Sequence, residues 1–173
     1  MKRFTIPTVR RSFLVAVLAL FALTATASAD DRAGPTGSGV QIRVPTGWKT
    51  SEIGKNGEAF LVSLSPDEQA SVMYAVVEAE NLQKAVKSLD AFLGKFVTGA
   101  KMPKVKKISL NGMKALAAKG AGKAKNGDVA IAVVIAQTPT GKVLFVIGLV
   151  NAAKKDAYKK TLEEVLAGVR PAS

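Results

Sequence analysis

The sequence predicts an α+β fold, an antiparallel meandering β-sheet of about six to seven strands with a helix packed on each face (an α/β/α sandwich). Turn sequences such as Asn-Gly separate short apolar or alternating runs, which indicates hairpins rather than parallel strands joined by helices. Residues 129–136 and 143–150 are apolar on both faces, so the sheet should be covered on both sides. Two other segments have apolar residues at helical spacing and could provide that cover.

Residues 1–29 have the three parts of a signal peptide: a basic start that includes Arg10 and Arg11, the apolar run FLVAVLALFALTA, and small residues that end at Ala29. As a helix, that run of about 13 residues would reach about 20 Å, short of a hydrocarbon core of about 30 Å. We therefore expect cleavage after Ala29 and export to the periplasm or the medium. RRSFL resembles the core of a twin-arginine signal, and the general secretory route fits equally well.

The composition of the exported part is basic and contains no cysteine. Four of the 25 Lys and Arg residues and none of the 13 Asp and Glu residues lie in residues 1–29, so the exported chain would carry a net charge of +8. Without cysteine the chain can form neither disulfides nor a lipobox lipid anchor. After signal cleavage we expect no transmembrane segment and one domain of ordinary size.

Residues 30–39, DDRAGPTGSG, are rich in Gly, Ser and Pro and predict a flexible leader, and a single domain is expected over residues 40–171. Asn-Gly pairs at 56–57, 111–112 and 126–127 predict type I′ hairpin turns. The predicted strands are Val40–Val44, Trp48–Lys55, Glu58–Leu64, Ala70–Glu78, Val105–Leu110, Met113–Lys119, Asp128–Gln137 and Lys142–Val150.

Helices are expected at 81–97, with Asn81 as N-cap, and at Ala152–Val169. Within 129–136, Val and Ile side chains alternate with Ala130, Ala132 and other residues of a mostly small face. A flat alanine face should let a helix approach the sheet closely.

The order of these elements, with VPTGW at Val44–Trp48 and LAGVRP at Leu166–Pro171, resembles the PsbP-like, Mog-type superfamily of α/β/α sandwiches. That superfamily includes small exported bacterial proteins of the DcrB and DUF1795 kind. Its members are mostly adaptors, one type docking on photosystem II and another on the Ran GTPase. The resemblance implies a binding role, but no partner-contact residue can be carried over to this chain.

Trp48, the only tryptophan, directly follows the Pro-Thr-Gly corner. We expect a structural role, in which the ring folds over the sheet edge and closes the core, because burying such a ring removes about 150–250 Å² from water. The alternative is an exposed ring that stacks on a ligand.

The residues needed for common catalytic sites are missing. The chain has no His and no Cys, which removes the usual general base, the thiol nucleophile and nearly every transition-metal site. No S-x-x-K or G-x-S-x-G motif occurs, and GKFVTGAK fails as a phosphate-binding loop. We therefore expect no enzymatic activity, no cofactor, no metal and no catalytic residue.

Lysines provide the remaining candidate site. One group surrounds a predicted strand start, and a second opens the last helix, where cations oppose the helix dipole and a bound anion would relieve that conflict. The alternative is an ordinary solvated face, and no interleaved aromatics suggest specific nucleic-acid recognition. The speculative anion-binding residues are Lys101, Lys104, Lys106, Lys107, Lys154 and Lys155.

The first functional hypothesis is a non-catalytic exported binding or adaptor domain that acts on a protein of the cell envelope. The alternative is an electrostatic binder of anionic lipid headgroups, lipopolysaccharide or other polyanions through the lysines. An enzyme of unknown class is the third.

Overall fold

A computed structural model describes residues 30–55, 58–77, 79–102 and 104–172. The predicted signal peptide and the turn at 56–57 lie outside the described residues. The elements are β1 (Asp30–Ala33), β2 (Val40–Val44), β3 (Lys49–Lys55), β4 (Glu58–Leu64), β5 (Ala70–Val77), α1 (Leu82–Leu93), β6 (Thr98–Lys101), β7 (Val105–Leu110), β8 (Met113–Ala124), β9 (Gly127–Gln137), β10 (Val143–Asn151), the 3₁₀ helix η1 (Ala152–Lys154), α2 (Lys155–Ala167) and β11 (Arg170–Pro171).

The strands form two antiparallel sheets. The large sheet has the order β3-β4-β5-β10-β9-β8-β6, and β7 also pairs with β8. The small sheet has the order β1-β2-β11. The two wholly apolar runs form β9 and β10 in the interior of the large sheet, as their composition predicts.

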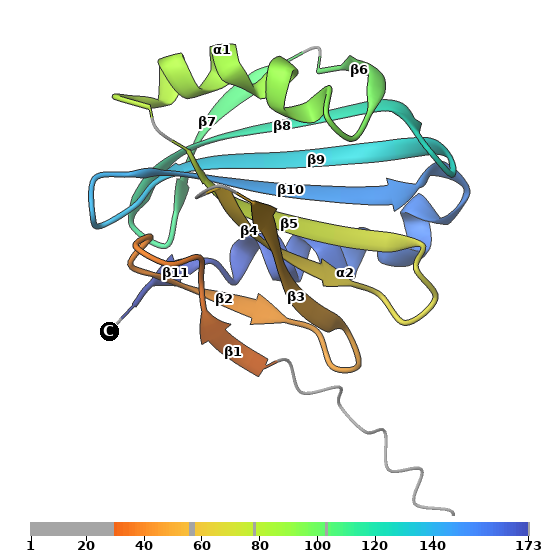
Figure 1. Ribbon diagram of the computed structural model, residues 1–173, viewed down its shortest axis with the longest axis horizontal. Coiled ribbons are helices and arrows are strands. Elements are labelled where there is room, and N and C mark those ends of the chain that lie inside the picture. The colour runs from red at the N-terminus through yellow and green to blue at the C-terminus, as the bar shows by residue number, and fades with distance from the viewer. Residues whose placement is uncertain (1–29, 56–57, 78, 103, 173) are drawn as a thin grey trace, which may run out of the picture.

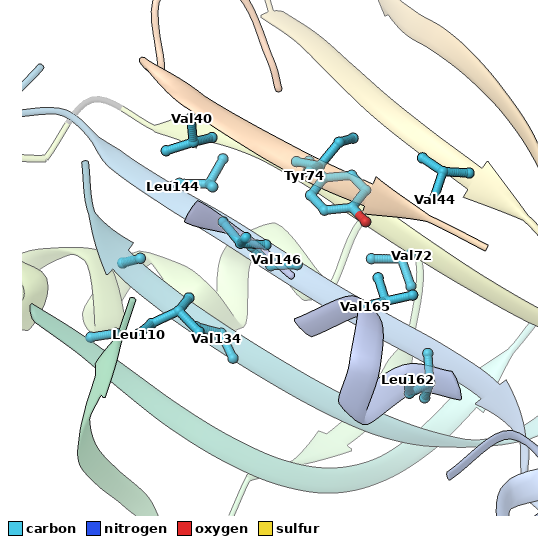
Figure 2. Close-up of a cluster of buried hydrophobic side chains, with 14 of the residues drawn as sticks. Val40, Val44, Val72, Tyr74, Leu110, Val134, Leu144, Val146, Leu162 and Val165 are labelled. Atoms are coloured by element: carbon cyan, nitrogen blue, oxygen red, sulfur yellow. The ribbon is translucent and has the colours of Figure 1, made fainter. Parts of the chain in front are cut away.

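Each face of the large sheet has its own core cluster. On the α1 side, Leu89 and Phe92 of α1 pack against residues such as Ile131 of β9. On the α2 side, α2 and the small sheet pack together against the large sheet, and Figure 2 shows side chains from all three that meet in this cluster. Figure 1 shows the small sheet lying beside α2 in this layer.

The predicted α/β/α sandwich of six to seven strands is wrong. The described part of the chain has eleven strands in two sheets and only two α-helices, and a three-stranded sheet shares the second layer with α2. One helix, about 10–12 Å wide, cannot cover so wide a sheet. The close approach that we expect at the alanine face occurs instead at Gly148 of β10, where an added Cβ would lie 3.3 Å from Cδ2 of Leu162.

The first four residues of the predicted flexible leader form a strand. Asp30–Ala33 form β1 and pair with β2 in register from Asp30 opposite Val44 to Ala33 opposite Gln41. Arg43 Nε and Arg170 Nη2 donate to the carboxylate of Asp31 at 3.3 and 2.8 Å. Arg170 lies 139 residues along the chain from Asp31, a contact that local composition cannot reveal.

Strand β8 is longer than predicted, because it continues through Gly120 and Gly122 to Ala124. An added Cβ at Gly120 would collide with the backbone of Lys101, and one at Gly122 would collide with the side chain of Val97. The glycines are therefore required by the close passage of β6.

The hairpin predictions have different outcomes. Asn111 and Gly112 have φ values of 47° and 84°, so the predicted two-residue turn with positive φ is confirmed. At the next hairpin, Ala124 pairs with Gly127, so Lys125 and Asn126 form the turn and the predicted Asn126-Gly127 turn is shifted by one residue. The N-cap prediction is confirmed, because Asn81 Oδ1 accepts a hydrogen bond from Lys84 N at 2.9 Å.

Candidate binding groove

A groove of about 370 Å³ lies between α2 and the neighbouring ends of β8, β9 and β10. It exists because α2 packs over β10 and leaves the adjacent part of the alanine face uncovered. Ala130 and Ala132, which the sequence predicts beneath a helix, are only half-buried and form part of the groove.

The groove combines an apolar interior with a charged rim. Its apolar lining comes from the two alanines of β9, from Val150 of β10 and from Leu162 and Leu166 of α2. Its charged lining residues are Lys119, Lys155, Asp156, Lys159 and Glu163.

The charges of the rim are partly compensated. Lys119 Nζ lies 3.7 Å from Glu163 Oε1, an exposed ion pair across the groove. Lys155 and Lys159, one helical turn apart, are exposed and form no ion pair with any residue that the structure describes. Asp156 lies in the first turn of α2, where its negative charge already complements the helix dipole. The predicted conflict between lysine and dipole is therefore smaller than the sequence suggests.

The structure divides the six predicted anion-binding lysines between several surfaces. Lys106 is paired with Ala117, a residue of the α2-side cluster, so both side chains lie on that side. Lys107 is paired with Leu116 of the α1-side cluster and lies on the opposite side. Lys101, at the end of β6, pairs with Ala121, which in turn pairs with Ala130 of the groove. Lys104 is exposed between β6 and β7, and Lys154 is exposed in η1.

Of those six, only Lys155 lines the groove. Lys159, which also lines the groove, is not among the six predicted residues, and the alanine face of β9 is not predicted as a binding floor. The small residues of 129–136 were the available signal, but they were assigned to helix packing. Lysines on β6 and β7 also have a structural explanation, because charged edge strands resist pairing with other chains.

Trp48 lies in the α2-side core with 9% of its surface exposed. It follows a turn in which Trp48 N donates to Pro45 O at 3.1 Å and Gly47 has a φ of 80°. The Tyr158 ring of α2 meets it edge-on, with the ring centroids 6.1 Å apart. Trp48 is not among the residues that line the groove.

Tyr158 also joins α2 to the turn between β4 and β5. Its hydroxyl donates to Asp67 Oδ1 at 2.5 Å, and Ser65 Oγ donates to the same oxygen at 2.8 Å. The hydrogen bond from Tyr158, followed by that from Ser65, lowers the pKa of Asp67 below its ordinary value. The same contact raises the pKa of Tyr158, because the neighbouring carboxylate favours the protonated phenol. Asp67 and Tyr158 thus hold α2 in position beside the sheet.

No group of three or more acidic residues that could hold a metal ion occurs in residues 30–172 outside the gaps at 56–57, 78 and 103. Over the same residues, neither helix is long and apolar enough to cross a membrane.

No protein-family model and no curated protein matches the chain. Solved structures do match it. The solution structure of a cyanobacterial PsbP from Synechocystis aligns with a TM-score of 0.62 at 11% identity, covering 84% of this chain and 94% of that one. The fold is PsbP-like.

Two other solved structures resemble this PsbP-like chain. A Pseudomonas aeruginosa protein of unknown function, described as a putative regulator, aligns with a TM-score of 0.50 at 13% identity over 80% of this chain and 94% of its own. A Bacteroides thetaiotaomicron protein aligns with a TM-score of 0.51 at 12% identity over 78% of this chain, which spans 46% of its length. At these identities the similarity shows the fold alone.

Proposed function

We propose that this chain is an exported, non-catalytic binding or adaptor domain whose partner is a protein of the cell envelope. The PsbP-like fold supports a binding role in this broad sense, because the superfamily that the sequence resembles consists mostly of adaptors. The absence of His and Cys from the whole chain also favours binding over catalysis.

One exposed apolar patch carries the proposal of a protein partner. Phe96, just after α1, is 37% exposed, and Ile53 of the edge strand β3 is 54% exposed. Phe60 connects them, because it pairs with Ile53 across the β3–β4 ladder and its ring centroid lies 6.5 Å from that of Phe96. Large apolar side chains exposed together beside a free strand edge are typical of protein-binding surfaces.

The test is site-specific crosslinking in the native envelope. A photoreactive amino acid at position 96 should capture a reproducible protein partner, identified by mass spectrometry. The same amino acid at position 160, where the Lys160 side chain of α2 is 90% exposed, is the matched control and should not capture it. Recovery of no reproducible partner from position 96 would contradict the proposal.

A second candidate is electrostatic binding of anionic lipid headgroups, lipopolysaccharide or other polyanions. The observation that favours it is the placement of Lys106, Lys155 and Lys159 on the α2 side. Binding through exposed lysines should weaken with salt, because the Debye length falls to about 8 Å at physiological ionic strength. If the exported protein elutes from heparin and from anionic vesicles at that ionic strength, this candidate should be abandoned.

A further inference from the structure

We propose that the groove between α2 and β8–β9 binds a single-chain anionic amphiphile, with the acyl chain on the alanine floor and the anionic head at Lys155 and Lys159. This inference rests on the second candidate function, anion binding on the α2 side, and adds a defined site and ligand class to it.

The groove floor is suited to a slender apolar chain. Ala130 and Ala132 have methyl side chains, so the sheet surface beside α2 is low, whereas Leu162 and Leu166 form an apolar wall along the helix. A volume of about 370 Å³ lies within the range of about 300–1,000 Å³ that is usual for small-molecule sites. Covering this floor would remove apolar surface from water, at about 25 cal/mol for each Å² buried.

The charges of the rim favour an anionic head. Three lysines and two acids line the groove, and one acid, Glu163, already has Lys119 as its partner. Lys155 and Lys159 have no such partner among the residues described, so their ammonium groups are available to a carboxylate or phosphate. Charge complementarity at one end of an apolar surface specifies an amphiphile whose head is negative.

The shape of the site favours a monomeric ligand over a membrane surface. Binding to a bilayer interface requires apolar side chains that project into it. The large apolar residues that the structure leaves exposed are Ile53, Phe96, Val105 and Ile108, and none of them lines the groove. The apolar surface of the groove is recessed beside α2, so the ligand must enter it as a single molecule rather than as part of a membrane surface.

Isothermal titration calorimetry of the exported protein with dodecyl phosphate, below its aggregation concentration, is the direct test. Dodecyl maltoside supplies the chain without the charge and should bind at least about tenfold more weakly. Replacing Lys155 and Lys159 together by Glu should weaken dodecyl phosphate binding by at least about tenfold, whereas Lys107→Glu on the opposite side should change it by less than about twofold.

The variant Ala132→Phe tests the floor, because a ring there would occupy the groove. It should abolish binding of dodecyl phosphate and leave the salt-dependent retention on heparin unchanged. Since this variant could disturb the sheet, backbone NMR of the unaltered protein provides an independent measurement. Dodecyl phosphate should shift the amide signals of Gly120, Ala132 and Lys159 and leave those of β3 unchanged.

Three results would overturn the proposal. They are no dodecyl phosphate binding, equal affinity for dodecyl maltoside, and amide shifts outside the groove. Retention on heparin or anionic vesicles without dodecyl phosphate binding would refute the groove and leave the second candidate function intact. If the protein neither is retained on heparin or anionic vesicles nor binds dodecyl phosphate, both the groove and the second candidate function are refuted.

Discussion

At the residue scale, Tyr74 of β5 places a polar hydroxyl group in the apolar core. Its side chain is fully buried among residues such as Val44 and Val72 (Figure 2), and its hydroxyl has no hydrogen-bond partner among the described residues. Burial raises the pKa of Tyr74 far above its ordinary value, so the phenol stays neutral.

We expect Tyr74→Phe to increase the free energy of unfolding by about 1 kcal/mol, because it removes a buried polar group that has lost its hydrogen bonds to water. Urea denaturation measures the change. Tyr158→Phe is the matched control and should lower stability, because that hydroxyl donates to Asp67. Destabilisation by Tyr74→Phe would show that the hydroxyl has a partner in solution.

Asp67 predicts a pH dependence of stability. Its hydrogen bonds lower its pKa in the folded state below the ordinary 3.8, so its contribution to stability is present above about pH 4 and is lost as the pH falls through the folded-state pKa. We expect Asp67→Asn to lower the urea midpoint at pH 6 and to have a smaller effect at pH 3. Equal effects at both pH values would exclude this linkage.

At the scale of elements, the hairpin between β7 and β8 both turns the chain and caps α2. Asn111 Nδ2 donates to the carbonyl oxygens of Ala167 and Val169 at 2.7 and 2.8 Å. Ala167 is the last residue of α2, where carbonyl groups lack partners within the helix, and Val169 directly follows the C-cap residue Gly168. One side chain therefore connects the edge of the sheet to the helix that forms the groove wall.

We expect Asn111→Gly to lower the free energy of unfolding by about 1–2 kcal/mol, because glycine keeps the positive φ but cannot donate these hydrogen bonds. Asn126→Gly, in the other described hairpin of β8, is the control and should have little effect. Chemical denaturation compares the two variants, and equal stabilities would mean that the cap contributes nothing.

At the scale of the whole molecule, the small sheet connects the two ends of the described chain. β2 lies between β1 and β11, and Asp31 of β1 accepts hydrogen bonds from both Arg43 and Arg170. Residues 30–33, in the segment that composition marks as flexible, are therefore part of the layer beside α2.

Deleting residues 30–33 from a chain that begins at Asp30 should lower its urea midpoint, because β2 would lose one ladder partner and Arg170 its carboxylate. Asp31→Asn should reproduce part of the loss, since it keeps the β1 ladder and weakens only the charged contacts. An unchanged midpoint after the deletion would support a flexible leader.

The sequence by itself determined the elements whose signal is local. Unbroken apolar runs located β9 and β10, and apolar residues at helical spacing located both helices. The pair Asn111-Gly112 specified its own turn, because only a few residue types accept two positive φ values. The missing His and Cys likewise limited the possible chemistry without any structure.

Only the tertiary structure decided which helices and strands form each layer. β1 and β11 are too short and too polar to be recognised alone, and they become strands because β2 provides the hydrogen-bonding edge between them. The groove also depends on the tertiary structure. The alanine face of β9 is visible in the sequence, but whether a helix covers it depends on the width of the sheet and on Gly148, which places α2 over β10 instead.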